Sequence, residues 1–319
     1  MKILICPLNW GLGHAARCVP IIRRLTDEGN EITIVADGFP LEFLRHEFPE
    51  LAFIEYSSYP IHYSEGKSQI GAMIRCFPKI IMKIISEHRW LKKLLKAEHF
   101  DMIISDNRFG LWNKNVHSVY ITHQLMIKMP KGLKFLEPIV WRFHRFFILK
   151  YDECWIPDYE GEKNLSGDLA HKYPLPKNAK FIGSLSRFSL LKDIIPKSEY
   201  QTVAVLSGVE PQRSLFEKEL IKRFENRAEK TLIVQGKPQK EKQIQTIQNI
   251  TIVSHLETSE LASVLLGAEQ IISRSGYSTI MDLDALNCLH KAELIPTPGQ
   301  TEQEYLAGKM TDRLFEQIK

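Results

Sequence analysis

Short apolar runs alternate with amphipathic segments along most of the chain. In the first half, apolar runs of strand length lie at residues 2–6, 31–36, 52–56, 101–106, 118–124 and 154–157. Segments with apolar residues at helical spacing separate several of them, which predicts parallel strands joined by helices. A polar loop is predicted at residues 57–68, followed by a long helix over 70–96 that Pro78 kinks or restarts.

A second alternation begins at Thr202, after a linker that ends near Pro196. Its predicted strands lie at residues 202–208, 231–235, 250–254, 270–273 and 292–295. With 319 residues, 44% of them hydrophobic, the chain is long enough to bury two cores. The pattern therefore predicts an α/β protein of two doubly wound, Rossmann-like domains, at residues 1–190 and 191–319.

The run from Ser273 to Leu283 joins a predicted strand to a predicted helix. Unpaired backbone N–H groups and the helix dipole favour an anion such as phosphate at this kind of turn. Gly276 lets a ligand approach the backbone, and three nearby residues offer hydroxyl groups: Ser275, Ser278 and Thr279. Asp282, about one turn further on, can accept hydrogen bonds from a ribose. An ordinary capped helix is equally compatible with these residues.

A second glycine-containing turn follows the first predicted strand. Residues 2–36 read as one βαβ unit whose turn contains Gly11-Leu12-Gly13-His14, without the full G-x-G-x-x-G spacing of dinucleotide-binding loops. His14 is thereby placed at the carboxyl edge of the sheet, where open α/β proteins bind ligands. Its intrinsic pKa near neutrality suits a general base, with Asp106 at the end of another strand to orient it. His123 is the competing base, and simple capping of the turn by His14 or Asp106 is the alternative.

These turns together resemble those of the two-domain GT-B glycosyltransferases. The most similar group is the family 28-like one, which contains the N-acetylglucosaminyltransferase of the peptidoglycan lipid precursor and the galactolipid synthases. Gly11-Leu12-Gly13-His14 resembles the family's opening turn, and Ser273–Leu283 resembles its Ser-Arg-Ala-Gly turn and helix. The resemblance implies two domains facing each other across a cleft, with the nucleotide sugar on the C-terminal domain and the acceptor on the N-terminal one.

Further segments extend the resemblance. Thr122-His123-Gln124 resembles a His-Glu-Gln segment on the acceptor side, and Gly183–Arg187 resembles the family's interdomain linker. By resemblance, the donor nucleotide sugar is contacted by Gly13, Arg187, Ser207, Gly208, Leu256, Arg274, Ser275, Gly276, Ser278, Thr279, Asp282, Gln300 and Gln303. Two departures concern this donor site: the second glycine loop is shortened and carries Glu210, and Asp282 replaces a ribose-binding glutamate.

The predicted reaction is an inverting transfer of a hexosyl or N-acetylhexosaminyl group from a nucleoside-diphosphate sugar, most simply a UDP-sugar. The start of the helix after Gly276 would stabilise the departing diphosphate, assisted by Arg274 or Arg187. No Asp-x-Asp pair follows a strand, so we expect neither a metal ion nor a cofactor. Two alternatives remain: a UDP-sugar 2-epimerase and a non-catalytic nucleotide-sugar-binding protein.

Composition adds a few limits. A net charge of +4 does not by itself indicate nucleic-acid binding. The five cysteines are scattered without metal-ligand spacing, the N-terminus carries no apparent signal peptide, and no apolar run reaches the ~18–20 residues of a spanning helix. The expected location is therefore the cytoplasm.

Residues 124–150 mix apolar and basic side chains. The apolar ones are Met126, Met129, Leu133, Phe135, Leu136, Trp141, Phe143, Phe146 and Phe147, and the basic ones are Lys128, Lys131, Lys134, Arg142 and Arg145. The preceding helix adds Lys79, Lys83, Lys92, Lys93 and Lys96. This pattern suits contact with the inner face of a membrane or a lipid-linked acceptor of the cell envelope. The alternative is that the aromatic residues belong to the core and the lysines are solvated.

Overall fold

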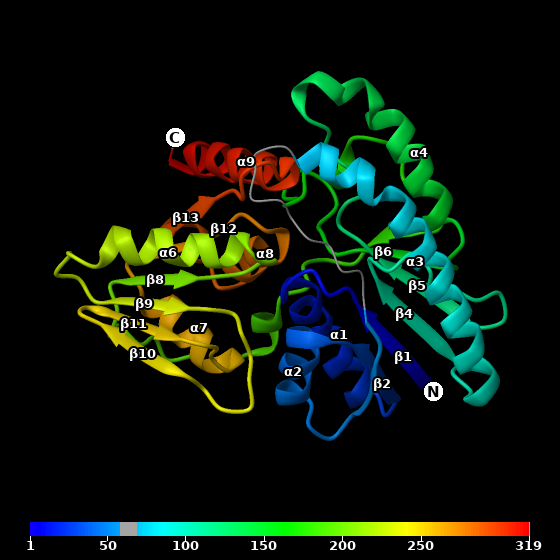
Figure 1. The fold of residues 1–319 in the computed structure, drawn as a ribbon, viewed down its shortest axis with the longest axis horizontal. Coiled ribbons are helices and arrows are strands. Elements are labelled where there is room, and N and C mark those ends of the chain that lie inside the picture. Colours follow the sequence, from blue (N-terminus) through cyan, green and yellow to red (C-terminus); the bar gives the residue numbers. More distant parts are fainter. Residues whose placement is uncertain (58–68, 319) are drawn as a thin grey trace. The chain divides into compact units, whose positions relative to one another are not determined.

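The computed structural model describes residues 1–57 and 69–318 (Figure 1). The chain divides into two compact units. Among the described residues, unit 1 comprises residues 1–9, 18–57 and 70–185, and unit 2 comprises residues 10–17, 69 and 186–318. The main segment of unit 2 thus begins at Ser186, whereas the sequence analysis began the second domain at residue 191.

Unit 1 is built on a seven-stranded parallel sheet with the strand order β3-β2-β1-β4-β5-β6-β7. Its strands are β1 (Lys2–Pro7), β2 (Glu31–Ala36), β3 (Ala52–Glu55), β4 (Met102–Asp106), β5 (His117–Ile121), β6 (Glu153–Ile156) and β7 (Ala179–Phe181). Its helices are α1 (Gly13–Asp27, whose first five residues belong to unit 2), α2 (Gly38–Glu47), α3 (Gln69–Ala97), α4 (Glu137–Ile148) and α5 (Asp168–His171), with a 3-10 turn η1 (Lys131–Leu136).

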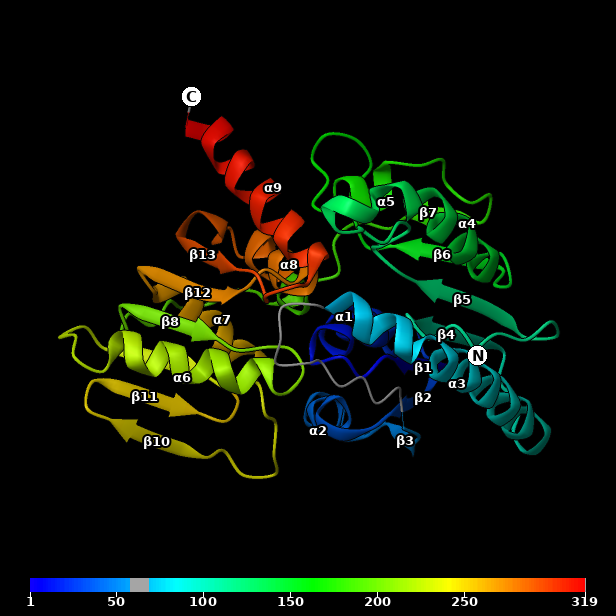
Figure 2. The same cartoon turned by 45° about the horizontal axis from the view of Figure 1, so that its top comes forward.

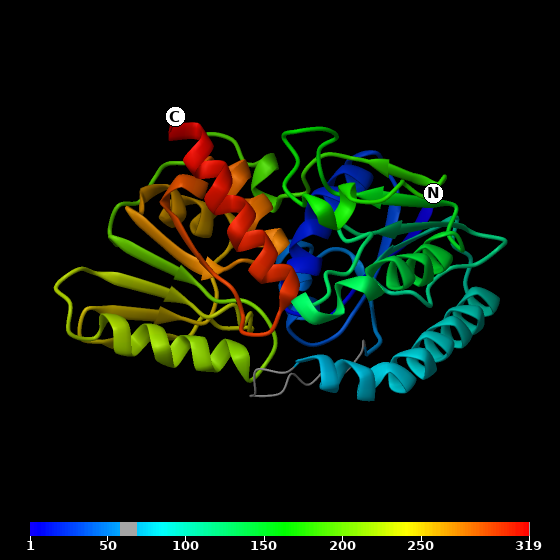
Figure 3. The same cartoon turned by 90° about the horizontal axis from the view of Figure 1, so that it is seen from above.

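Two helices, α3 and α4, cover the same face of this sheet (Figures 1 and 3). Leu4 and Cys6 of β1 form a buried cluster with Leu91 of α3. Further along the sheet, Tyr120 of β5 packs with Ile148 of α4. Cys6 and Tyr120 lie on the same face because Ser105 of β4 is the register partner of both.

Unit 2 has a six-stranded sheet with the strand order β10-β11-β9-β8-β12-β13 (Figure 2). Its strands are β8 (Thr202–Val205), β9 (Thr231–Val234), β10 (Ile244–Ile247), β11 (Ile250–Val253), β12 (Gln270–Arg274) and β13 (Ala292–Ile295). Its helical elements are η2 (Arg187–Leu190), α6 (Gln212–Phe224), α7 (Thr258–Gly267), α8 (Tyr277–Ala285), η3 (Leu289–Lys291) and α9 (Thr301–Ile318).

Adjacent strand residues of unit 2 point to opposite faces and fill two cores. Val203 and Ile271 pack toward α7 and α8, in a cluster with Leu261 and Leu283. Their neighbours Ala204 and Ile272 pack toward α6, in a cluster with Phe216, Leu220 and Phe224. A strand covered by helices on both faces is apolar throughout, which is why these runs were recognisable in the sequence.

The predicted fold class, α/β with two Rossmann-like domains, is confirmed in each unit. One local detail differs from expectation. Strand β10, missed in the sequence, pairs antiparallel with β11 at the edge of the sheet. The predicted long helix is present as a single helix from Gln69 to Ala97 that contains Pro78, so the proline does not start a new helix. Of the loop predicted at residues 57–68, all but Ser57 lies outside the described residues.

Strand β10 could not be predicted from the hydrophobic pattern because it is a short, exposed edge strand. Its residues, Ile-Gln-Thr-Ile, are mostly exposed and carry little apolar signal. The turn to β11 consists of Gln248 and Asn249, and Gln248 has a positive φ of 52°. A two-residue hairpin turn of this kind favours positive φ angles, but pairs such as Asn-Gly or Asp-Gly are the usual signal for it, and this turn has no glycine. Within the described residues, no helix is both long and apolar enough to cross a bilayer.

Candidate functional site

In unit 2 the strand order reverses between β8 and β12, which are direct neighbours. Val205, the last residue of β8, is the register partner of Ser273 in β12. In open α/β sheets, ligands bind outside the carboxyl ends of the strands at such a reversal point. The loops that leave these two strands contain Ser207-Gly208 and Ser275-Gly276. The topology thus brings together the two predicted donor-binding loops.

The turn before α8 is open at its backbone. Gly276 precedes the helix with φ −72° and ψ 143°. A Cβ built on Gly276 would approach only Thr279 Oγ1, at 3.9 Å. Tyr277 is buried and fixes the first turn of the helix in the core. The start of α8, with its N–H groups and positive dipole end, is therefore a suitable place for an anion.

The hydroxyl groups around this turn have different surroundings. Ser275 Oγ donates to the backbone carbonyl of Gln303 at 2.8 Å, so it braces the start of α9. Ser273 is fully buried at the end of β12, and its Oγ has no hydrogen-bond partner among the described residues. A buried hydroxyl without a partner is unfavourable unless a ligand or water satisfies it.

The Asp282 carboxylate contacts Ser186 and Arg187, which begin the main segment of unit 2. Ser186 Oγ donates to Asp282 Oδ1 at 2.6 Å, and Arg187 Nε lies 3.6 Å from Oδ2. Burial raises the pKa of the Asp282 carboxyl, while the Arg187 charge and the Ser186 hydrogen bond act in the opposite direction. The structure thus brings together Asp282 and Arg187, both predicted to contact the donor.

Glu210, which would repel a diphosphate, is compensated within unit 2. Its Oε1 accepts hydrogen bonds from Nε and Nη2 of Arg213, at 2.8 and 2.6 Å. Burial raises the pKa of Glu210, but hydrogen bonds from Ser214 and Arg213 outweigh it and lower the pKa overall. Arg213 was missed in the sequence analysis, although its position three residues after Glu210, at the start of a helix, was an available signal.

The side chain of Arg274, at the end of β12, contacts other parts of unit 2. Its guanidinium carbon lies 3.9 Å from the centroid of the Phe216 ring, and Nη1 donates to the Pro296 carbonyl at 3.0 Å. Burial lowers the pKa of this guanidinium from its usual value. Arg274 therefore anchors the loop after β13. Gln303 stabilises the same loop, because its Oε1 accepts from the Thr297 backbone N–H at 2.8 Å, and the Gln300 N–H donates to the Thr297 carbonyl.

The glycine turn at residues 10–17 belongs to unit 2 by its contacts. Gly11 has φ +82°, and a Cβ at this position would lie 3.1 Å from the backbone nitrogen of Gly208. Ser278 Oγ donates to the Gly13 carbonyl at 3.0 Å. A Cβ on Gly13 would lie 3.0 Å from the same Ser278 Oγ, so both positions of the turn favour glycine. Three residues of the predicted donor site thus lie together: Gly13, Gly208 and Ser278.

His14 follows this turn and is bound by Arg17. Arg17 Nη2 lies 2.9 Å from His14 Nδ1, and Arg17 is almost fully buried. A guanidinium only donates, so Nδ1 is the acceptor, and the neutral ring carries its proton on Nε2. Sequence reasoning missed Arg17, although it lies one helical turn after His14.

In unit 1 the strand order reverses between β1 and β4, where Pro7 and Asp106 are register partners. Asp106 is fully buried, and its Oδ2 lies 3.7 Å from the Cys18 thiol sulfur. His123 follows the neighbouring strand β5 and is 6% exposed. The Gln124 N–H donates to Thr122 Oγ1 at 3.1 Å, which fixes the turn after β5. Asp106, His123 and Gln124 therefore lie at the carboxyl edge of the sheet in unit 1, and their catalytic and acceptor-binding roles stay predictions.

Leu256, predicted to contact the donor, lies just beyond β11 and packs against the core of unit 2. The preceding residue, His255, is 8% exposed, and its Nδ1 lies 2.9 Å from Ser254 Oγ.

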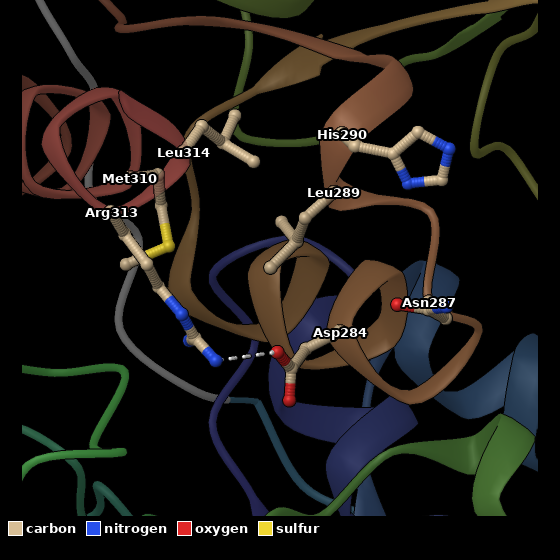
Figure 4. A pocket seen from close by; sticks show the side chains of 7 residues that line it. All are labelled: Asp284, Asn287, Leu289, His290, Met310, Arg313 and Leu314. Atoms are coloured by element: carbon tan, nitrogen blue, oxygen red, sulfur yellow. Dashed lines mark ion pairs between the residues drawn. The ribbon is translucent and has the colours of Figure 1, made fainter. Parts of the chain in front are cut away.

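A cavity of about 90 Å³ lies beside the other end of α8 (Figure 4). It is lined by Asp284, Asn287, Leu289, His290, Met310, Arg313 and Leu314. Across it, Arg313 Nη2 lies 3.4 Å from Asp284 Oδ1. None of the residues predicted to bind the donor lines this cavity, so it is separate from the turn before α8.

Comparison with known proteins agrees with this architecture. No protein-family model matches the chain. An uncharacterized glycosyltransferase of Methanosarcina acetivorans is 25% identical over 175 residues, which is 50% of this chain and 42% of that protein. The matched region therefore spans less than half of that relative.

Three solved structures cover nearly the whole chain. The glycotransferase of kitacinnamycin has a TM-score of 0.56 at 13% identity, covering 98% of this chain and 95% of its own. The spinosyn rhamnosyltransferase SpnG complexed with thymidine diphosphate has a TM-score of 0.53 at 13% identity, covering 99% and 96%. MnaA of S. aureus, solved with UDP, has a TM-score of 0.54 at 12% identity, covering 99% and 90%. The chain shares their fold.

Proposed function

We propose that the protein is a glycosyltransferase that takes a sugar from a nucleoside-diphosphate sugar, most simply a UDP-sugar. The observation that carries the proposal is the open turn before α8, at the reversal point of the sheet in unit 2. Similar structures were solved with thymidine diphosphate and with UDP, which supports a nucleoside diphosphate as the ligand. The resemblance to the family 28-like group supports the same assignment.

In the proposed reaction, an acceptor hydroxyl oxygen attacks the anomeric carbon of the donor sugar from the face opposite the diphosphate. The bond from that carbon to the diphosphate oxygen breaks, and its electron pair leaves with the diphosphate, so the anomeric configuration inverts. The N–H groups at the start of α8 and the Arg187 guanidinium stabilise the departing charge. The acceptor proton passes to His14, with His123 as the competing base.

The acceptor and the location complete the proposal. Unit 1 would bind a glycan or lipid-linked acceptor near Asp106, His123 and Gln124, which lie at the carboxyl edge of its sheet. We place the protein in the cytoplasm, at the inner face of the membrane, with a role in the cell envelope. No metal ion takes part in this mechanism.

Calorimetric titration with UDP tests the proposed donor site. The variant Gly276→Asp should abolish UDP binding, because it sets a carboxylate against the diphosphate. Its side chain has room, since the nearest atom to a Cβ is 3.9 Å away, so the fold should survive. Gly308→Asp is the matched control, because it adds the same charge to unit 2 at an exposed helical position with open space. Normal UDP binding by Gly276→Asp would place the site elsewhere.

A further inference from the structure

The outer side of η1 and α4 carries large apolar side chains that are exposed. They are Phe135, Ile139, Phe143, Phe146 and Leu149, with exposed fractions of 71%, 61%, 43%, 55% and 39%. Intervals of four and three residues align Ile139, Phe143 and Phe146 along one stripe of α4, and Phe135 precedes them in η1. A contiguous stripe of this kind marks an interaction surface. We call these five residues the α4 face.

Although these side chains are exposed, helix α4 is firmly packed against the sheet by its other side. On the inner side of α4, Glu137, His144 and Ile148 are buried. His144 Nδ1 lies 3.2 Å from the Leu125 carbonyl, and Ile148 belongs to the core with Tyr120. The helix is thus fixed to the sheet by one side, and the α4 face points outward.

The exposed charges on η1 and α4 are positive. Lys134, Arg142 and Lys150 are exposed beside the α4 face. Glu137 is the only acidic residue between positions 126 and 151, and it is 1% exposed. Its carboxylate is neutralised internally by Lys172. The surface therefore combines an apolar stripe with cations that no acidic residue of the same segment offsets.

Several of the cations lie against aromatic rings. Lys150 Nζ is 4.4 Å from the centroid of the Phe146 ring. The guanidinium groups of Arg142 and Arg145 lie 5.8 and 5.6 Å from the Trp141 ring. Trp141 in turn stacks on Tyr173, with ring centroids 5.0 Å apart. Tryptophan and tyrosine favour the boundary between lipid and water, where basic groups also meet lipid phosphates.

The neighbouring helix α3 also exposes apolar side chains. It covers the same face of the sheet as α4 (Figure 1) and exposes Met82 and Ile85, by 61% and 45%. Trp112 lies between α3 and the residues that follow α4, because its ring contacts His88 of α3 and lies 5.8 Å from Lys150 Nζ.

We propose that the α4 face docks on a bilayer that contains anionic lipid, with α4 lying in the plane of the interface. A second copy of the chain is a poor occupant, because two faces with the same cations would repel each other. The inference deepens the proposed function, since the membrane is where a lipid-linked acceptor is met. Lipid binding can nevertheless be measured without any transferase activity.

Sedimentation with lipid vesicles tests this surface. The whole protein should bind vesicles in which about a third of the lipid is phosphatidylglycerol, and bind pure phosphatidylcholine far more weakly. The double variant Phe135→Ser/Ile139→Ser should reduce partitioning by about tenfold. Replacing Lys134 and Arg142 with glutamine should reduce it by about fivefold for each charge removed. Both variants should keep UDP binding, which reports on the donor site separately.

The matched control is Ile195→Ser/Phe315→Ser, which removes two comparably exposed apolar side chains, 78% and 65% exposed, from unit 2. It should bind vesicles as the unmodified protein does. Equal binding to both kinds of vesicle, equal losses in the control and in Phe135→Ser/Ile139→Ser, or no vesicle binding would each overturn the proposal. So would a dimer in solution that Phe135→Ser/Ile139→Ser dissociates, because the face would then be covered by a second copy.

Discussion

The contact between Arg17 and His14 determines which ring nitrogen can take a proton. Arg17 Nη2 donates to Nδ1, so the neutral ring carries its proton on Nε2. If Nε2 is to accept the acceptor's proton, the ring must first change tautomer. The contact between Nδ1 and Arg17 must then break, because Nδ1 would carry the proton. The sequence located His14 at the start of its helix, but the partner of its side chain depends on rotamers that no spacing rule determines.

We expect His14→Ala to lower the transfer rate by a factor of about 10²–10⁴, the usual scale for loss of a general base. UDP affinity should change little, because the proposed diphosphate site is at the start of α8 and not at His14. Initial rates of UDP release, with UDP titration beside them, measure both quantities. His99→Ala, at an exposed histidine, is the control.

A transfer rate near that of the unmodified protein in His14→Ala would remove His14 from the mechanism and favour His123. A large fall in UDP affinity would instead make His14 a donor-binding residue and leave the base unassigned.

At the scale of elements, most strands and the helices between them followed from the hydrophobic pattern. Strands such as β8 and β12 are buried on both faces, so their apolar runs are unmistakable. The edge strand β10 lacks that signal because its side chains are largely exposed. The turn before α8 was predictable from its serines and glycine. The pairing of Asp282 with Ser186 was not, because those residues are 96 positions apart in the chain.

Helix α4 contains a buried histidine that makes its packing sensitive to pH. Burial lowers the pKa of His144 to about 4, although the hydrogen bond to the Leu125 carbonyl acts in the opposite direction. In the unfolded chain the pKa is about 6.5. Between these values the unfolded state binds more protons, so stability should fall as the pH drops from about 6.5 towards 4.

The full linkage corresponds to about 3 kcal/mol of unfolding free energy. Urea unfolding across this pH range measures it, with His144→Asn as the comparison, because asparagine donates a hydrogen bond but does not titrate. The unmodified protein should lose more stability than the variant as the pH falls. Parallel curves for the two proteins would contradict a neutral, buried His144.

At the scale of the whole molecule, the two units share one feature of sheet topology. Each sheet reverses its strand order next to a strand with a glycine-containing loop, β1 in unit 1 and β8 in unit 2. The sequence predicted these loops as separate motifs, and the strand orders explain why the residues predicted to bind ligands lie together there. The acceptor could not be predicted in the same way, because side chains from several distant loops of unit 1 would determine it.

The last prediction concerns metal ions. The chain has one Asp-x-Asp sequence, Asp282-Leu283-Asp284, and it lies within helix α8. Asp282 accepts from Ser186, and Asp284 lies 3.4 Å from Arg313, so each carboxylate already has a protein partner. The helix start and Arg187 would neutralise the leaving diphosphate in place of a divalent cation. The rate of UDP release should therefore be unchanged in excess EDTA. Loss of activity in EDTA that magnesium or manganese restores would refute the metal-independent mechanism, while UDP binding that persists in EDTA would leave the donor site itself intact.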